Sequence, residues 1–323
     1  MNNKLLTALK VFAVPTGYAI FLRFVFGINT WGSLFSVMSI SFLFCLPTIV
    51  GILTVYFSPP EKAAKRSYYL MVPWVPIGIF MLITIAFRWE GWACWLMVLP
   101  LFALAGSVGG SYGSALNKRK HDNKLYISAF CLLPLLIAPL EKQLGAIPGT
   151  YKAYTVIDIH ASGNTIWKNV TRVREIPMEQ DKGWLTKTLG FPRPVRAELN
   201  YNGIGAYRKA IFTNGLVFDE TVLDYQEQQR MVFRIQARKH EIPSTTMDEH
   251  VVIGGDYFDV LNGTYELEPL NDDTYRLHLY SNFKLSTTFN FYASWWAKWI
   301  MQDIQNNILQ VIKARAESEE IRK

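Results

Sequence analysis

The chain has 323 residues, enough for two domains, and half of them are hydrophobic. Its formal net charge of +7 belongs to the first part: residues 1–150 contain 12 Lys and Arg against 4 Asp and Glu, whereas residues 151–323 contain 21 against 22. The cations of the first part lie in loops between apolar runs, where they set membrane orientation, so we predict no nucleic-acid binding. All three cysteines lie in apolar runs, which excludes a disulfide or a cysteine metal site in the second part.

The first part contains runs of the length that a membrane span requires. About 20 apolar residues cross a hydrocarbon core of roughly 30 Å, and three runs reach that length: Ser33–Phe57, Tyr68–Phe87 and Trp92–Leu116. Leu5–Phe26 contains Lys10 and Arg23, which fit either a span with charged ends or an interfacial helix. Leu125–Leu140 has 16 residues and two prolines, so it spans only with local thinning of the bilayer.

Orientation follows from two basic loops, Glu61–Arg66 and Lys118–Lys120, which the positive-inside rule places in the cytoplasm. If Leu125–Leu140 spans, the second part is extracytoplasmic; if that segment is re-entrant, the second part is cytoplasmic. We predict a bundle of about five spans over residues 1–144, a linker over 145–150 and an extracytoplasmic domain. The expected location is a bacterial inner membrane, with the lipid bilayer as a partner.

The glycine-rich stretch 105–113 is typical of close helix packing. Gly106, Gly109, Gly110 and Gly113 form small-xxx-small patterns, which serve either packing within the bundle or a homo-oligomer contact between copies. The three long runs contain no charged residue, and intramembrane charges usually mark transport pathways. The first part is therefore interpreted as an anchor.

The second part predicts an α+β domain. The sequence indicates a strand over 153–160, short helices over 165–170 and 182–189, and about six antiparallel strands near 195–202, 205–212, 216–225, 229–237, 257–268 and 274–286. A long helix over 292–316 follows, and then a charged tail over 318–323. One stripe of this helix is apolar and is expected to face the core: Trp295, Trp299, Ile300, Ile304, Ile308, Val311 and Ile312. The other face carries Lys298, Asp303, Asn307, Gln310 and Lys313.

Several stretches of the second part resemble a known family. Tyr154–His160 followed by Asn164–Trp167 is similar to its opening strand and tryptophan-bearing helix. Gly205–Arg208 and Gly215–Val222 resemble its central hairpin, and Tyr275–Ser281 with the 292–316 helix resembles its closing strand and gripping helix. The family is the START-like (SRPBCC) superfamily, which includes polyketide cyclases, pollen-allergen-like proteins and lipid-transfer domains.

The resemblance covers residues 151–317 and implies a helix-grip fold, in which a curved antiparallel sheet surrounds a long C-terminal helix. It also implies a hydrophobic pocket between sheet and helix, with a few orienting polar groups. Residues Arg238–Gly255 depart from the family pattern as a long polar insertion. The superfamily contains binders, carriers and enzymes, so the resemblance specifies fold more than function.

One charged pair stands out among the candidate pocket residues. Phe218, Glu220 and Val222 alternate along one strand, so they share a face that is otherwise apolar. Arg208 faces Glu220 if the turn Thr213–Gly215 is a three-residue loop, and a two-residue loop separates them. The pair then either orients a ligand head group, performs acid–base chemistry or stabilises the hairpin.

The candidate ligand-binding residues are Arg208, Glu220, Phe218, His250, Tyr257, Tyr265, Tyr292 and Trp296. His250, beside Asp248 and Glu249, fits proton chemistry near neutral pH or an ordinary surface loop. No histidine or carboxylate spacing predicts a metal site. No cofactor is predicted and no catalytic residue is assigned.

The sequence thus predicts a membrane-anchored START-like domain that binds, or binds and transfers, a hydrophobic ligand such as a lipid or isoprenoid. Two alternatives stay open: a cyclase- or dehydratase-type enzyme acting on a membrane-derived substrate, and a structural or regulatory module whose own side chains fill the pocket.

Overall fold

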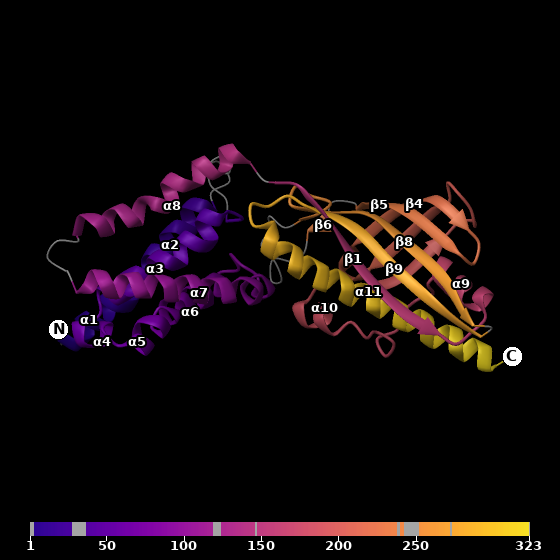
Figure 1. Cartoon of the computed structure of the whole chain (residues 1–323), viewed down its shortest axis with the longest axis horizontal. Helices are drawn as coiled ribbons and strands as arrows, with labels where there is room; N and C mark the ends of the chain where they lie inside the picture. The colour runs from indigo at the N-terminus through magenta and orange to yellow at the C-terminus, as the bar shows by residue number, and fades with distance from the viewer. Residues whose placement is uncertain are drawn as a thin grey trace. The chain divides into compact units, whose positions relative to one another are not determined.

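The computed structural model describes residues 3–27, 37–118, 124–145, 147–237, 240–241, 252–271 and 273–322. The chain divides into two compact units. The helical unit contains residues 1–147 and 287–289, and the sheet unit contains residues 148–286 and 290–323. Figure 1 shows the elements of both units, and the fold class is α+β as predicted.

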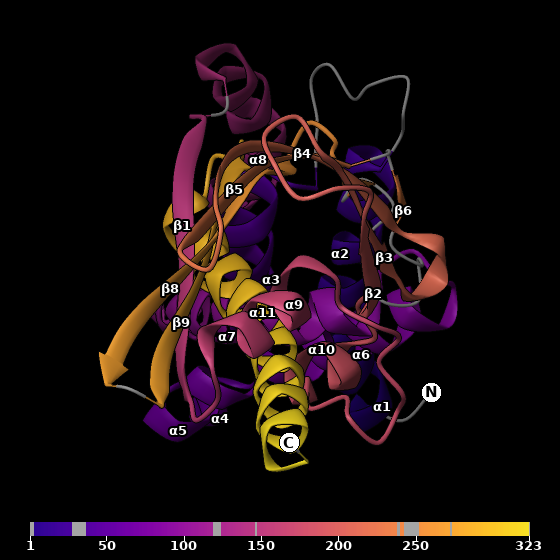
Figure 2. The same ribbon diagram turned by 90° about the vertical axis from the view of Figure 1, so that its right-hand side faces the viewer.

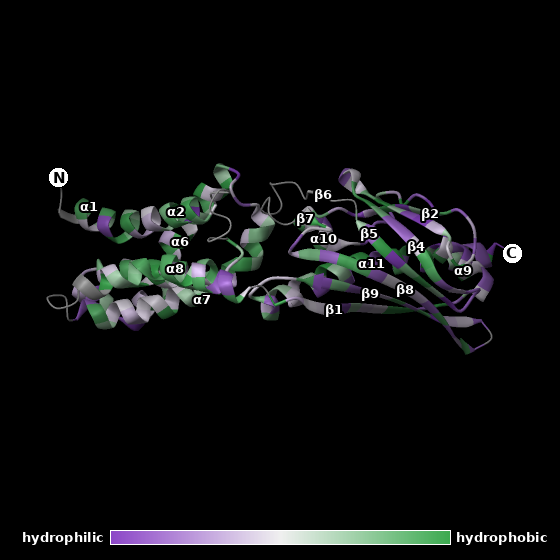
Figure 3. Ribbon diagram, turned by 90° about the horizontal axis from the view of Figure 1, so that it is seen from above, coloured by the Kyte–Doolittle hydropathy of each residue, from purple (hydrophilic) through white to green (hydrophobic). Residues whose placement is uncertain are grey.

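The helical unit consists mainly of apolar helices. Its elements are α1 (Asn3–Ala8), η1 (Leu9–Ala13), α2 (Val14–Phe26), η3 (Ser41–Cys45), α3 (Leu46–Tyr56), α4 (Pro60–Ala63), α5 (Arg66–Met71), α6 (Trp74–Ala86), α7 (Trp92–Asn117) and α8 (Lys124–Leu144). Four helical segments are long and apolar enough to cross a membrane: Leu5–Phe26, Arg66–Ala86, Trp92–Asn117 and Ile127–Leu144. Ser41–Tyr56, the described part of the predicted span Ser33–Phe57, is shorter. Figure 3 shows the hydrophobic residues along these helices.

The segment that the sequence left ambiguous, Leu125–Leu140, lies within the continuous helix α8. Near its start, Ile127 packs with Leu53 and Tyr56 of α3. Near its end, the Glu141 carboxylate accepts hydrogen bonds from the backbone N–H groups of Ile40 (2.6 Å) and Ser41 (3.0 Å). These contacts place α8 antiparallel to the η3–α3 segment along that segment's whole length.

Polar contacts mark the two ends of the helical unit. At one end, Arg23 of α2 donates to the Glu90 carboxylate (2.7 Å) in the turn between α6 and α7, and both side chains are buried. At the other end, the Asn117 amide at the end of α7 donates to the carbonyls of Val55, Tyr56 and Ser58. Successive long helices therefore run in opposite directions, and the first basic loop, residues 61–66, lies at the Asn117 end, where Ser114 donates to the carbonyl of Ala63.

The glycine-rich stretch of α7 packs against backbone inside the helical unit. A Cβ at Gly109 would lie 1.9 Å from the carbonyl oxygen of Thr48, and one at Gly110 would lie 1.9 Å from that of Tyr69. A Cβ at Gly113 would lie 2.6 Å from the Ile52 oxygen. These glycines let α7 approach α3 and α5 closely. The predicted homo-oligomer through residues 105–113 is not tested by these contacts and stays a prediction.

The sheet unit is built on one antiparallel sheet. Its strands are β1 (Gly149–Ile159), β2 (Pro194–Leu199), β3 (Tyr207–Phe212), β4 (Val217–Gln226), β5 (Arg230–Ala237), β6 (His240–Glu241), β7 (Val252–Ile253), β8 (Phe258–Asn271) and β9 (Thr274–Leu285). The main strand order is β1-β9-β8-β5-β4-β3-β2. The seven strands of this path form the curled sheet seen end-on in Figure 2. The short strands β6 and β7 lie in the insertion Arg238–Gly255, which was predicted as long and polar.

Three helices cover the concave face of the sheet: α9 (Gly163–Thr171), α10 (Trp184–Leu189) and α11 (Asn290–Ile321). The core between them is apolar, and its fully buried members include Ile159, Ile166, Met231, Leu277 and Ile312. β1 begins inside the predicted linker, and α11 continues through most of the predicted charged tail.

The prediction for the two faces of α11 was wrong in part. Asp303 and Asn307, which were expected on the exposed face, are buried. The Asp303 carboxylate accepts from the backbone N–H and the hydroxyl of Thr186 (2.8 and 2.7 Å), which satisfies a donor in the first turn of α10. Because α10 covers this side of the helix, Trp295 and Trp299 of the predicted core stripe remain exposed.

The packing of α7 predicts the effect of adding a methyl group at Gly109. The substitution Gly109→Ala should lower the stability of the full chain by about 1–3 kcal/mol, because the methyl collides with backbone that cannot rotate away. A Cβ at Gly78 of α6 meets no atom within 4 Å, so Gly78→Ala is the matched control and should be neutral or stabilising by up to about 1 kcal/mol. Thermal unfolding in detergent measures both, and equal melting temperatures for the two variants would contradict the packing.

Candidate functional site

The three-residue turn of the β3–β4 hairpin places Arg208 opposite Glu220. Thr213–Gly215 form one 3-10 turn, in which Asn214 and Gly215 adopt left-handed φ angles of 60° and 79°. Asn and Gly tolerate this conformation, which explains their place in the turn. The resulting register pairs Arg208 directly with Glu220. The predicted pairing is confirmed, and the two side chains form an ion pair.

This ion pair is buried on the concave face. Arg208 is 3% exposed and Glu220 is 4% exposed. The Arg208 guanidinium also lies over the rings of Phe233 (5.3 Å) and Tyr265 (5.8 Å) and forms a side-chain hydrogen bond with Tyr265. The aromatic faces provide favourable cation–π contacts where water is excluded. Arg208, Glu220 and Tyr265 therefore form one polar cluster within the apolar core.

The hydrogen-bonding capacity of the cluster is not fully used. The Nε atom of Arg208 is buried and has no hydrogen-bond partner within the described part of the chain. An unpaired buried donor costs about 1–3 kcal/mol, and a charged group costs more. Such a donor is therefore available to an acceptor atom of a bound molecule.

Burial also sets the electrostatics of the cluster. Desolvation raises the pKa of Glu220, and the neighbouring Arg208 cation opposes this shift without cancelling it. Burial raises the pKa of the Tyr265 hydroxyl as well. Arg208 keeps its charge, since Glu220 and Tyr265 raise its pKa despite the desolvation of the guanidinium. The arrangement favours a cationic arginine that presents hydrogen-bond donors in an apolar surrounding.

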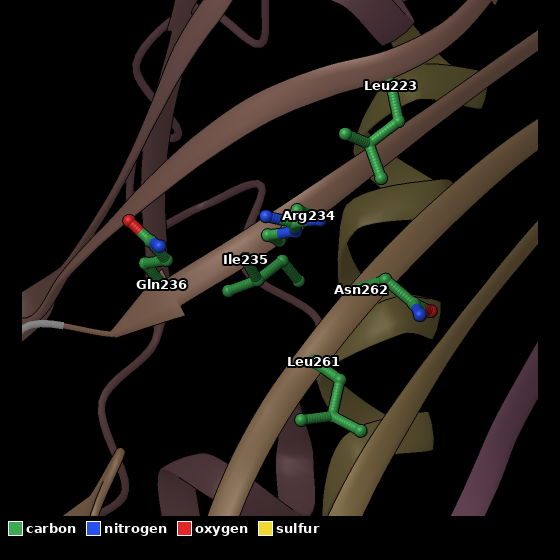
Figure 4. Close-up of a pocket in the computed structure, with 6 residues that line it drawn as sticks. All are labelled: Leu223, Arg234, Ile235, Gln236, Leu261 and Asn262. Atoms are coloured by element: carbon green, nitrogen blue, oxygen red, sulfur yellow. The ribbon is translucent and has the colours of Figure 1, made fainter.

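A cavity of about 410 Å³ opens one strand away from this cluster. It is lined by Leu223 of β4, by Arg234, Ile235 and Gln236 of β5, and by Leu261 and Asn262 of β8. The β5–β8 ladder ends at the pair Arg234–Asn262, after which the two strands separate around the cavity, as Figure 4 shows. Ile235 is the cross-strand neighbour of Glu220, so one row across three strands contains Arg208, Glu220 and the cavity wall.

Two β-bulges contribute to this cavity. The register of β4 against β5 shifts between Val222 and Asp224, and that of β8 against β9 shifts between Val260 and Asn262. Leu223 and Leu261 are the extra residues at these shifts. Bulges re-aim side chains, which explains how two leucines reach the opening. Sequence reasoning missed both residues, because strand alternation alone carries no signal for a bulge.

The structure brings together only some of the predicted site residues. Phe218 is buried on the face of Glu220 and contacts Phe212 edge to face at 5.2 Å. Tyr265 lies beside Arg208, a contact that no local sequence pattern predicts. Tyr257 is half-buried just before β8. His250 lies outside the described residues.

Tyr292 and Trp296 belong to a different place, the first turns of α11. Tyr292 lies 6.4 Å from Trp295, and Trp296 packs against Trp295 (5.2 Å) and Trp299 (5.3 Å). The Trp296 ring nitrogen is buried without a hydrogen-bond partner among the described residues. No group of three or more His, Cys, Asp and Glu side chains in the described part of the chain is placed to hold a metal ion.

The burial of the ion pair predicts a large effect of removing one partner. Arg208→Met should lower the free energy of unfolding by about 3–5 kcal/mol, because Glu220 then lacks its cation. The double variant Arg208→Met with Glu220→Leu should regain most of this loss, because no buried charge remains. Without Arg208 the pKa of Glu220 rises further. The protonated carboxyl then stabilises the fold below its ordinary pKa, and this contribution is lost as pH rises through the folded-state pKa.

The stability deficit of Arg208→Met should therefore grow between about pH 5 and about pH 8. Thermal unfolding of the full chain in detergent at both pH values measures it, with the double variant as the pH-insensitive control. Equal stability of the single and double variants at the higher pH would contradict the buried pair.

No protein-family model matches the chain, and no curated protein sequence matches it. Solved structures do show likeness over about half of the chain. A START superfamily protein from Mycobacterium smegmatis is 12% identical with a TM-score of 0.36, and the match covers 53% of this chain and 99% of that protein. Norcoclaurine synthase from Thalictrum flavum is 12% identical with a TM-score of 0.33, over 54% of this chain and 98% of the synthase.

A protein from Arthrobacter aurescens is 14% identical with a TM-score of 0.31, and the match covers 52% of this chain and 86% of that protein. The START superfamily protein belongs to the family that the sequence resembles. At these identities and TM-scores, the likenesses assign neither a family nor an activity to this chain.

Proposed function

We propose that this chain is a multi-pass membrane protein whose sheet unit binds a hydrophobic molecule that carries one hydrogen-bond-accepting group. The observation that carries the proposal is the unpartnered Nε of Arg208, a buried cation on the concave face of the sheet. A fold that needed only a structural ion pair would leave no donor of that pair unused. A carbonyl, carboxylate or phosphate oxygen of a ligand would complete it.

The cavity supports a ligand of moderate size. Its volume of about 410 Å³ lies in the range of small-molecule sites, which is roughly 300–1,000 Å³. Leucine and isoleucine side chains form its apolar wall, and Arg234 and Asn262 supply polar groups at its rim. Of the lining residues of β5, Ile235 lies on the face of Glu220, its cross-strand neighbour, whereas Arg234 and Gln236 are exposed on the opposite face.

Membrane anchoring favours a lipid or isoprenoid as the ligand class. Four helices are long and apolar enough to span, and a domain tethered beside a bilayer meets membrane-borne molecules at high local concentration. Transfer of the ligand to or from the bilayer is the activity that such a tether would serve.

Topology supports an extracytoplasmic sheet unit in a bacterial inner membrane. The basic loops lie at the Asn117 end of the helical unit, which the positive-inside rule assigns to the cytoplasm. α8 starts after the second basic loop and ends at the opposite end, where Glu141 caps the start of η3. The chain then continues directly into the sheet unit.

A second candidate function is acid–base chemistry of the cyclase or dehydratase type. Arg208 contacts both Glu220 and Tyr265, and burial raises the pKa values of these two acids. Raised pKa values suit proton donors at neutral pH. In that case Glu220 or Tyr265 would protonate a bound substrate, and Arg208 would stabilise the charge that develops.

Native mass spectrometry of the full chain, released from membranes in detergent, tests the binding proposal. The wild-type chain should carry a reproducible bound mass. Arg208→Lys keeps the charge but removes Nε, so retention should fall about 10- to 100-fold, the value of one hydrogen bond to a charged group. Arg230→Lys is the matched control, because Arg230 forms only an exposed pair with Asp224 at 3.8 Å.

Equal retention by Arg208→Lys and the wild type would contradict the role of Nε, and a wild-type chain without bound mass would overturn the binding proposal. Glu220→Gln separates the two candidate functions. If this variant carries the same molecule as the wild type, binding alone is favoured; if it accumulates a different mass, turnover at the site is favoured.

Alkaline phosphatase fusions in a bacterial host test the topology, because this enzyme is active only outside the cytoplasm. A fusion after Thr150 should be active, and a fusion after Lys118, in the second basic loop, should be inactive. The reverse pattern would place the sheet unit in the cytoplasm.

A further inference from the structure

The first turns of α11 carry an aromatic cluster whose function the binding site does not explain. It contains Trp184 of α10 and Tyr292, Trp295, Trp296 and Trp299 of α11. Ring centroids are 5.3–6.0 Å apart for Trp184–Trp299, Trp295–Trp299 and Trp296–Trp299. Trp295 is 55% exposed and Trp184 is 60% exposed. Contiguous exposed aromatic surface of this kind marks an interaction site.

The same turns of α11 already have a buried side, so the cluster is not an incomplete core. Ala293, Ala297 and Met301 pack against Phe283 and the other buried residues of that layer. The buried Asp303, one turn after Trp299, holds α10 through Thr186. Small residues thus face the sheet, and α10 adds Trp184 to the outward tryptophans of α11. The fold assembles the aromatic surface from two helices.

Chain connectivity indicates what the cluster contacts. Residues 287–289 belong to the helical unit, and Asn290, the first residue of α11, belongs to the sheet unit. Thr288 donates to the Glu141 carboxylate (2.5 Å) in the last turn of α8, at the end of the bundle where Arg23 and Glu90 pair. The cluster therefore follows directly, along the chain, after a point at one end of the apolar helices.

The residue types of the aromatic cluster also suit contact with the surface of a lipid bilayer. Trp and Tyr are enriched at the boundary between head groups and acyl chains, because their rings are apolar and their N–H or O–H groups are polar. Lys182 and Lys187 flank Trp184 and are exposed. Cations around an aromatic surface favour anionic lipid head groups.

We propose that the aromatic cluster is a membrane-docking surface, which inserts its tryptophan rings into the head-group region of the bilayer that holds the helical unit. The proposal rests on the membrane function proposed above for that unit. Docking would bring the sheet unit against the lipid surface from which its ligand comes. It uses no residue of the Arg208 cluster.

Spin-label accessibility in the full chain tests this surface. The chain is prepared without its native cysteines (Cys45, Cys94 and Cys131 replaced by Ala) and reconstituted in nanodiscs of synthetic zwitterionic and anionic lipids. A nitroxide is attached at Trp295→Cys or, separately, at Trp299→Cys. Ile204→Cys, 65% exposed in the turn between β2 and β3, is the aqueous control, and Leu82→Cys, an exposed position of α6, is the bilayer control.

Collision rates with oxygen, which partitions into lipid, and with a water-soluble nickel chelate are then compared. The oxygen-to-nickel ratio at positions 295 and 299 should be several-fold higher than at 204 and should approach the ratio at 82. Ratios at 295 and 299 equal to that at 204, with a lipid-like ratio at 82, would overturn docking alone. Dipolar broadening between labels at 295 would place a second copy of the chain on the cluster and also overturn the proposal.

A water-like ratio at position 82 would overturn membrane anchoring and docking together. The binding proposal is distinguishable in every case, because the mass bound to the wild-type chain is measured without reference to these labels.

Discussion

The buried contact between Arg208 and Glu220 constrains the whole concave face of the sheet. A cation and a carboxylate removed from water need each other and further hydrogen-bond partners, or the fold loses several kcal/mol. Tyr265 and the ring of Phe233 provide part of that compensation. The strands that carry these residues must therefore keep one register, and the helices that cover them must exclude water.

This constraint also bears on function. Apolar residues of similar volume often stabilise a core as well as a buried ion pair does, or better. The ligand proposed above would supply an acceptor for the unused donor of this pair. The adjoining cavity exists because β5 and β8 separate beyond Arg234 and because bulges direct Leu223 and Leu261 toward the opening.

The polar residues of α11 organise the opposite side of the domain. Asp303 and Asn307 bind the backbone of the segment around α10, and Gln305 donates to Ser281 of β9. These contacts fix α11 in rotation. The same rotation leaves Trp295 and Trp299 exposed, so the aromatic surface and the closed core result from one set of hydrogen bonds. In the helical unit, close packing depends on glycines, which allow α7 to approach α3.

The sequence by itself determined the division into an apolar and a strand-rich part and the order of the main strands and helices. It left the pairing of Arg208 with Glu220 dependent on the length of one turn, which the structure shows to be three residues. These features depend on local periodicity and on turn chemistry such as Asn214-Gly215, which neighbouring residues encode. Only the tertiary structure decided that α8 runs the length of α3, because a short run with two prolines is ambiguous until its partners are known.

The tertiary structure also decided which residues of α11 are buried and where the cavity lies. A helical stripe predicts which residues can share a face, but Asp303 became buried because α10 offered it an unsatisfied N–H group. Tyr265 reached Arg208 across β4, β5 and β8, a contact between residues far apart in the chain. Bulges at Leu223 and Leu261 arise from the twist of packed strands, and no local pattern in the sequence specifies that twist.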